Sequence, residues 1–224
     1  MRQRLEQKAI TMDLIIVRHG QSTGNITTDD VPDGELTPLG RRQAQEAAAR
    51  LADDGLTHVL SSPLIRALAT GSAIAEAAGI EYVEVWPELQ EHRSSVHRGF
   101  GQADLLRDFP RAHFTSGVES DGWDHGGETY ETATERGYTA IARLRDRFSP
   151  GDRVAVATHG AFANYLLRAI LHIPASLPVW FTMSNCGFTM VRFAKPPLRA
   201  GFSFERADAD ILAVNDVSHI SEVS

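Results

Sequence analysis

The chain has 224 residues, of which 42% are hydrophobic and 23% charged, and its formal net charge is −7. This length and composition are typical of one globular domain with a substantial core. An acidic chain has no broad basic surface for nucleic acid, so an anion-binding site must be a local group of Arg and His side chains. The single cysteine, Cys186, excludes an intramolecular disulfide and a Cys-based zinc cluster.

The ends of the chain and its apolar runs bear on location and domain boundaries. No apolar run is long enough to span a bilayer, and the first residues show no hydrophobic stretch of signal-peptide length. We therefore expect a cytoplasmic protein with no membrane partner. Residues 1–12 are expected to form a loose N-terminal extension, and residues 13–224 a single domain. The sequence does not fix the oligomeric state, and a homodimer stays open.

Short apolar runs rich in β-branched residues alternate with longer amphipathic runs along the chain. In the first half, the predicted elements are a strand at 13–17, a helix opened by Thr37 and Pro38 and ended by Gly55, a strand at 58–60, a helix from Pro63 and a strand at 82–85. In the second half, they are a helix at about 130–148, a strand at 153–158, a helix after it, and strands at 188–193 and 211–214. This alternation predicts an α/β fold, a three-layer sandwich with a mostly parallel central sheet and helices on both faces.

The stretch from 86 to 127 departs from this alternation. It is rich in Gly, Arg, His and Asp and shows no regular pattern. A connection of this length without secondary structure of its own is usually functional. We interpret it as an irregular lid or specificity insertion within the domain.

Polar residues follow the predicted strands at the points where the strands end. In chain order they are Arg18, His19, Gly20, Ser22 and Asn25 after the first strand, Arg66 after the second, Glu88 and Glu91 after the third, and His159 and Gly160 after the fourth. The carboxyl ends of parallel strands meet at one edge of a sheet, where ligands bind, so these side chains should converge. A lone Arg or His is usually a solvated or structural residue, but the whole set is hard to explain by packing.

These residue types suit phosphoryl transfer. Guanidinium groups bind phosphate oxygens bidentately and stabilise charge during in-line displacement, and a neutral imidazole can be the attacking group. Gly20 and Gly160 would let backbone and phosphate approach closely, and Ser22 and Asn25 can add hydrogen bonds. A protonated carboxylic acid near the leaving oxygen would act as general acid.

Over nearly its whole length, the sequence resembles the histidine phosphatase superfamily, which includes phosphoglycerate mutases. The resemblance is carried, in order, by LIIVRHGQSTGN, LTPLGRRQA, SSPLIRALAT, GGET and VATHGAFANYLL. It implies that His19 is phosphorylated. The residues that it implies for binding the phosphoryl group are Arg18, Arg66 and His159, and those that it implies for lining the pocket are Ser22 and Asn25. We expect no cofactor and no metal ion.

The proton donor is open between two carboxylic acids. The segment LQEH places Glu91 where the family's proton donor lies, and Glu88 is its rival. The following segment, HRSSVHRGFG, departs from the family's aromatic and Gly-containing pattern, so the resemblance does not supply the substrate contacts. Glu128 in GGET is interpreted as ordering a loop near the pocket.

The predicted reaction is the hydrolysis of a small phosphorylated metabolite, in which His19 attacks, Glu91 protonates the departing oxygen and water releases phosphate. A phosphoglycerate mutase is the runner-up. It is disfavoured because the 86–127 segment is short for a mutase insertion, and because no Lys or Arg follows Arg206 to close over a bisphosphorylated ligand. Arg93 is the candidate for recognising a second anionic group, together with Arg98, Arg107 and Arg111.

Two other classes of function compete with these. A catalytically silent adaptor that binds phosphoesters would be expected to lack the nucleophile, an Arg or the second His, and all are present. A metal hydrolase is suggested by nine His residues and by Asp124 next to His125. However, there is no HExxH motif, and His92 and His97 are five positions apart, a spacing that does not place both on one helical face.

Overall fold

The computed structural model describes residues 11–194 and 209–224. Its strands are β1 (Thr11–Arg18), β2 (His58–Ser61), β3 (Val83–Val85), β4 (Val96–Gly99), β5 (Ala112–Phe114), β6 (Trp123–Gly126), β7 (Arg153–Thr158), β8 (Phe188–Ala194) and β9 (Ala209–Asp216). Its helices are α1 (Thr23–Ile26), α2 (Pro38–Leu51), α3 (Ile65–Ala77), the short 3-10 helix η1 (Pro87–Leu89), α4 (Gln102–Asp108), α5 (Tyr130–Arg147) and α6 (Gly160–Ile170). Within the described ranges, no helix is long and apolar enough to cross a membrane.

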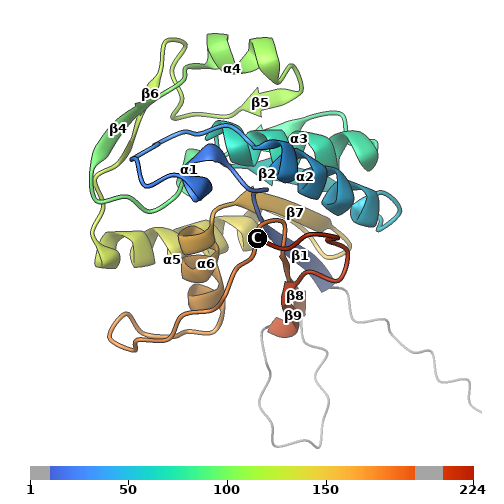
Figure 1. The fold of residues 1–224 in the computed structure, drawn as a ribbon. Helices are drawn as coiled ribbons and strands as arrows, with labels where there is room; N and C mark the ends of the chain where they lie inside the picture. Colours follow the sequence, from blue (N-terminus) through green and yellow to red (C-terminus); the bar gives the residue numbers. More distant parts are fainter. Residues whose placement is uncertain (1–10, 195–208) are drawn as a thin grey trace, which may run out of the picture.

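Seven of the strands form one sheet between two layers of helices (Figure 1). The strand order is β5–β3–β2–β7–β1–β8–β9. From β5 to β1 neighbouring strands are parallel, whereas β8 pairs antiparallel with β1 and β9 pairs antiparallel with β8. Helices α2 and α3 cover one face, and α5 and α6 cover the other. The expected α/β sandwich with a mostly parallel sheet is therefore confirmed.

Strand β1 lies in the interior of the sheet, and its position explains why its sequence is a continuous apolar run. Leu14 and Ile16 pack into the cluster beneath α5 and α6, while Ile15 and Val17 pack into the cluster beneath α2 and α3. Successive side chains of a strand point to opposite faces, so a strand covered on both faces needs apolar residues throughout. Each buried side chain of this size contributes about 1.5–3 kcal/mol.

Helix α2 starts as its sequence predicts. The hydroxyl of Thr37 accepts a hydrogen bond from the backbone N–H of Gly40 at 3.0 Å, and Pro38 occupies the first helical position. The helix ends at Leu51, and the chain then turns through Gly55, which has a φ of 72°. A left-handed φ of this kind favours glycine.

The N-terminal boundary of the domain lies two residues earlier than expected. Strand β1 begins at Thr11, and Met12 is paired with Phe193 of β8 and buried in the core. The loose extension therefore cannot include residues 11 and 12. The reason lies in the antiparallel partner β8, which is almost the whole chain away and invisible to local sequence patterns. Residues 1–10 of the expected extension lie outside the described residues.

The segment from 86 to 127 is regular rather than irregular, which corrects the expectation from its sequence. It contains η1, β4, α4, β5 and β6. Strand β5 pairs parallel with β3 and extends the central sheet, and β4 and β6 form a separate antiparallel pair. These strands have three or four residues, and polar and apolar residues occur on both their buried and exposed faces, so no apolar periodicity marks them.

Candidate active site

The carboxyl ends of β1 and β7 bring two histidines together. His19 follows β1, and its backbone N–H donates to the carbonyl of Thr158, the last residue of β7, at 2.9 Å. His159 follows that residue and precedes α6. Both side chains are buried, and their ring centroids lie 5.1 Å apart in an edge arrangement. The predicted convergence of these two residues is thus present in the structure.

Hydrogen bonds define which nitrogen of His19 carries the proton. Nδ1 lies 2.7 Å from the carbonyl oxygen of Gly20, which can only accept, so Nδ1 is protonated. Nε2 lies 3.2 Å from Nε of Arg66, which can only donate, so Nε2 keeps its lone pair. The ring is a neutral imidazole with Nε2 as its nucleophilic nitrogen.

The surroundings of both histidines favour the neutral ring. Burial lowers the pKa of His19 well below its ordinary value, and the charges of Arg66 and Arg18 lower it further. Burial likewise lowers the pKa of His159, with Arg66 as the next cause. Desolvation and nearby positive charge both disfavour a charged imidazolium, so His19 is poised as a nucleophile at neutral pH.

The two arginines are positioned by backbone carbonyls. Arg66 is 5% exposed and donates to the carbonyl of Pro32 at 3.0 Å, and its guanidinium lies 3.5 Å from the carboxylate of Asp33. Arg18 donates through Nη1 to the carbonyl of Met183 at 2.6 Å. Its buried Nε has no hydrogen-bond partner within the described part of the chain. Both guanidinium groups therefore keep fixed positions beside the histidines.

The two candidate proton donors lie in different surroundings. The carboxylate of Glu91 accepts from the backbone N–H of Phe162 at 3.0 Å and of Ala161 at 3.3 Å, in the first turn of α6. The negative charge of Glu91 also raises the pKa of Arg18 and Arg66 against the effect of burial, which places it among the site residues.

Glu88, in contrast, forms an ion pair with Arg143 of α5. That guanidinium also lies over the ring of Trp86, 3.9 Å from its centroid. The geometry therefore brings Glu91, and not Glu88, to the edge of the sheet where His19 and His159 lie.

The loop after His19 is braced by short polar contacts. Asn25 is exposed, and its Oδ1 accepts from the backbone N–H of Ser22 at 2.9 Å. Ser22 is buried at the start of α1. Gly20 donates through its N–H to Thr70, and its Cα faces the backbone of Gly40 in α2. Glycine is therefore needed at position 20 because the backbone of helix α2 approaches it closely. This reason differs from the close approach of a phosphate expected from the sequence.

Gly160 lies beside one of the site arginines. A Cβ atom added to it would come within 3.3 Å of Nε of Arg18. Glycine at this position therefore leaves room for the side chain of Arg18, and the expected close approach of phosphate stays a prediction.

Arg93 and Glu128 lie next to this group and are already paired. Arg93 donates to the carboxylate of Asp30 at 2.6 Å and to the carbonyl of Val31 at 3.1 Å. Glu128 accepts two hydrogen bonds of 2.6 Å from Arg136, which also donates to the backbone after η1. Glu128 therefore orders the chain around Glu91, as its interpretation from the sequence suggested. The remaining candidate arginines contact other parts of the protein: Arg98 contacts Asp124, Arg107 contacts Asp104, and Arg111 contacts the carbonyl of Ile80.

Several site residues were not found from the sequence. Asn185 is buried and donates to the carbonyl of His19 at 2.8 Å from 166 positions away, so no local pattern could reveal it. Ser62 lies 2.9 Å from Nε2 of His159, and its place directly after β2 was the available signal. Asp33, which contacts Arg66, lies in a polar loop with no motif of its own.

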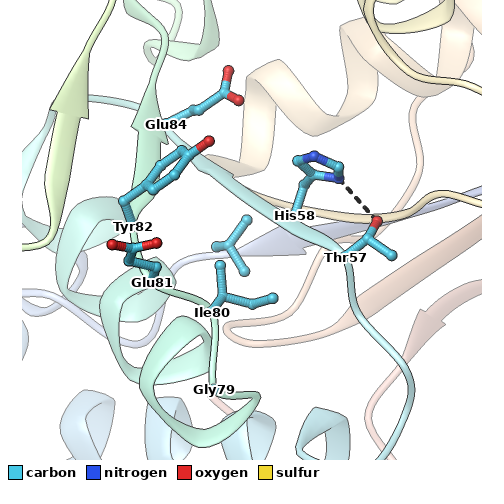
Figure 2. Close-up of a pocket in the computed structure, with 8 residues that line it drawn as sticks. Thr57, His58, Gly79, Ile80, Glu81, Tyr82 and Glu84 are labelled. Atoms are coloured by element: carbon cyan, nitrogen blue, oxygen red, sulfur yellow. Dashed lines mark hydrogen bonds between the residues drawn. The ribbon is translucent and has the colours of Figure 1, made fainter.

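A cavity of about 190 Å³ lies at the opposite ends of the strands (Figure 2). Thr57 and His58 line one side, at the start of β2, and Glu81, Tyr82 and Glu84 line the other, around the start of β3. The carboxylate of Glu84 accepts from Arg147 and from the indole of Trp86. Because that carboxylate is already paired and the cavity is remote from the carboxyl ends of the strands, it is not the candidate active site.

The arrangement of the potential metal ligands bears on the alternative of a metal hydrolase. Considering residues 11–194 and 209–224, no group of three or more His, Cys, Asp and Glu side chains is placed to hold a metal ion. The Asp124 and His125 pair raised by the sequence lies on β6, where successive side chains point to opposite faces. His92, the other histidine considered, contacts Tyr165 at 2.9 Å.

Comparisons with known proteins agree with this geometry. The sequence profile of the histidine phosphatase superfamily (branch 1) matches residues 14–199. A probable phosphoglycerate mutase GpmB from Cronobacter sakazakii is 28% identical over 214 residues, which cover 93% of this chain and 95% of that protein. A structure named mycobacterial hydrolase 2 has a TM-score of 0.65 at 26% identity and covers 92% of this chain and 91% of that one.

A second solved structure, a mycobacterial glucosyl-3-phosphoglycerate phosphatase in complex with VO3, has a TM-score of 0.61 at 27% identity. The match covers 80% of this chain and 92% of that one. The family profile spans most of the chain, from β1 to beyond β8. The protein therefore belongs to the histidine phosphatase superfamily and is an enzyme of the histidine phosphatase type.

Proposed function

We propose that the protein hydrolyses small phosphate monoesters through a phosphohistidine at His19, without a metal ion. The observation that carries the proposal is the buried neutral imidazole of His19, whose Nε2 lone pair points at the guanidinium of Arg66. A nucleophile and a phosphate-binding cation are thereby in direct contact. This arrangement suits attack on a dianionic phosphate that the arginines hold.

In the first step, Arg66 turns its hydrogen bond from Nε2 of His19 to an oxygen of the phosphate. The freed lone pair of Nε2 forms a bond to phosphorus as the bond from phosphorus to the ester oxygen breaks. Arg18 and Arg66 bind the oxygens of the transferring group, and His159 lies beside His19, with their ring centroids 5.1 Å apart. With the phosphate dianion bound beside it, Glu91 carries a proton, because the like charge disfavours its carboxylate; it gives this proton to the departing oxygen, which leaves as an alcohol. General acid catalysis of this kind contributes about 10²–10⁴ in rate.

In the second step, water attacks the phosphorus of phosphohistidine. The carboxylate of Glu91 accepts the proton that the water loses, and the bond between phosphorus and Nε2 breaks. Inorganic phosphate leaves, and both His19 and Glu91 return to their starting protonation states. The same carboxylate thus acts first as acid and then as base.

The test is phosphate release from p-nitrophenyl phosphate in EDTA by the wild type and by His19→Ala. We expect metal-free turnover by the wild type and none above background by the variant. Rapid quenching should also trap a phosphoryl group on the wild type that is acid-labile and alkali-stable, as phosphoramidates are. Turnover that needs an added divalent ion, or that His19→Ala retains, would refute the proposal.

The similarity to proteins named probable phosphoglycerate mutase favours one second candidate. In a mutase, the phosphoryl group on His19 would pass to a hydroxyl of the bound substrate instead of water. Incubation with 3-phosphoglycerate separates the two reactions. Formation of 2-phosphoglycerate faster than inorganic phosphate would support the mutase, and phosphate release without the isomer would support the hydrolase.

A further inference from the structure

The two-stranded sheet formed by β4 and β6 turns an aromatic face toward the loop at residues 30–33. His97 of β4 is the cross-strand partner of His125 of β6, and their ring centroids lie 5.7 Å apart. Trp123 stacks on His125 at 4.9 Å. The side chains that alternate with them on β6 and β4, including Asp124, are exposed. The β4–β6 sheet therefore has an inner face made of His97, Trp123 and His125.

This inner face lies against the loop that positions Arg66. His97 lies 3.8 Å from the carboxylate of Asp30. Arg93, just before β4, donates to the same carboxylate at 2.6 Å. Two to three residues further on, Pro32 and Asp33 contact Arg66, as described above. His125 thus lies on the face of the β4–β6 sheet that packs toward the loop holding Arg66.

His125 itself is buried without a hydrogen bond. Its side chain is 2% exposed, and neither Nδ1 nor Nε2 has a partner among the described residues. Burial, followed by the charges of His97, Arg93 and Arg66, lowers its pKa to about 4. At neutral pH the ring is therefore uncharged, with one nitrogen as donor and the other as acceptor. Leaving such buried groups unpaired is costly, so both nitrogens call for a partner that the described residues do not supply, either a water molecule or a ligand.

We propose that His125 determines substrate specificity by hydrogen bonding to hydroxyl groups on the alcohol part of a phosphorylated polyol or sugar. The proposal rests on the phosphatase function proposed above. A phosphate bound by Arg66 would place the rest of its ester near the loop at residues 30–33, against which the β4–β6 sheet packs. There the imidazole of His125 is the buried side chain with free hydrogen-bonding capacity on both nitrogens.

The chemistry of the ring selects hydroxyl groups over anions. A carboxylate or second phosphate can only accept, so it would pair with the N–H and leave the lone pair of the other nitrogen facing negative charge. A hydroxyl group both donates and accepts, so two neighbouring hydroxyls satisfy both nitrogens. A site whose buried groups pair with substrate hydroxyls also rejects the analogue that lacks them, because the groups are then left unpaired.

The experiment compares glycerol 3-phosphate with propyl phosphate, which has the same carbon chain without the two hydroxyls. We expect the wild type to favour glycerol 3-phosphate in kcat/KM by about tenfold or more. His125→Phe should bring this ratio close to one, and His125→Gln, which keeps a donor and an acceptor, should restore part of it. His113→Phe, an exposed histidine on β5, is the matched control and should keep the wild-type ratio.

The outcomes separate this inference from the proposed function. A wild-type ratio near one, or a ratio that His125→Phe leaves unchanged, would overturn the role of His125. Loss of folded protein lowers both rates equally and leaves the ratio intact, so the ratio is the readout. If the wild type does not hydrolyse p-nitrophenyl phosphate, the proposed function fails instead. Calorimetric binding of the same two esters to His19→Ala, with and without His125→Phe, then decides the inference by the ratio of dissociation constants.

Discussion

Nε of Arg66 donates a hydrogen bond to Nε2 of His19 across 3.2 Å. The cation that would bind the phosphoryl group is therefore also the group that holds the nucleophilic lone pair in place. Arg66 is in turn held by Pro32 and Asp33, from a loop more than thirty residues before it. Nucleophile, cation and loop form one connected unit, and this connection leads to the first prediction.

Replacing Arg66 with Lys should lower kcat for p-nitrophenyl phosphate by about 10²–10³, comparable to the loss of one donor to a developing oxyanion. A lysine keeps the charge but cannot present the planar donor fork that contacts both His19 and an oxygen of the substrate. Arg98→Lys, at an exposed arginine of β4, is the matched control and should keep wild-type kcat. Equal kcat values for the two variants would contradict the role assigned to Arg66.

The pH dependence of activity should reflect the depressed pKa of His19. Because burial and two arginines hold that pKa well below 6.5, the imidazole stays neutral and nucleophilic as the pH falls through 6.5. We expect kcat/KM for an aryl phosphate to show no acidic limb near pH 6.5 arising from the enzyme. A tenfold loss per pH unit beginning at 6.5, after correction for ionisation of the substrate, would show that His19 titrates normally.

Asp33 should make the protein less stable as the pH rises from 4 to 6. Burial raises the pKa of its carboxyl from 3.8 to about 6, so between these values the folded state binds a proton that the unfolded state has lost. Unfolding is then favoured as the pH increases, and the effect is complete above pH 6. Asp33→Asn removes this dependence and should gain on the order of 2–3 kcal/mol relative to the wild type between pH 4 and 7.

Asp30 provides the control with the opposite sign. A hydrogen bond from Arg93 lowers the pKa of this exposed carboxyl, so its contribution to stability is present above pH 3.8 and is lost as the pH falls through the folded-state pKa. Asp30→Asn should therefore lose stability at neutral pH instead of gaining it. Denaturant unfolding at pH 4, 5, 6 and 7 measures both variants, and a common sign would contradict this account.

The sequence predicts the parts of this protein in which chemistry and local pattern coincide. The apolar run at Leu14–Val17 needs cover on both faces, and the cap at Thr37 needs only its own helix, so both are readable without tertiary information. His19 and His159 could be placed together because parallel strands end at one edge.

Other features depend on distant partners or on short polar elements. Asn185 reaches His19 from the far end of the chain, and the inclusion of Met12 in β1 depends on β8. The β4–β6 sheet that carries His125 consists of two four-residue strands whose inner face is aromatic and polar. The sequence pattern of these strands therefore resembles that of a loop. Burial without a hydrogen bond, the property that marks His125, exists only in the folded chain.

The competing acids Glu91 and Glu88 should respond differently to the leaving group. Glu91→Gln removes the proton donor, so hydrolysis of an alkyl phosphate should slow by about 10²–10⁴, whereas 2,4-dinitrophenyl phosphate, whose leaving group needs no proton, should be affected far less. Glu88→Gln weakens an ion pair with Arg143 and should leave both rates near wild type. Measuring kcat for the two esters in each variant tests the assignment, and a reversed pattern would make Glu88 the donor.

Two glycines should separate packing from catalysis. A Cβ at Gly40 would overlap the backbone carbonyl of Gln21, which cannot move without shifting the loop after His19. Gly40→Ala should therefore destabilise the fold by about 1–3 kcal/mol, as overpacking does. A Cβ at Gly160 would come nearest to the side chain of Arg18, with Nε at 3.3 Å, and a side chain can shift. Since alanine also favours the helix, Gly160→Ala should keep or raise the melting temperature while it displaces Arg18 and lowers kcat/KM. Thermal unfolding and steady-state kinetics on both variants check this, and loss of stability at Gly160→Ala with unchanged kcat/KM would show that the residue serves packing alone.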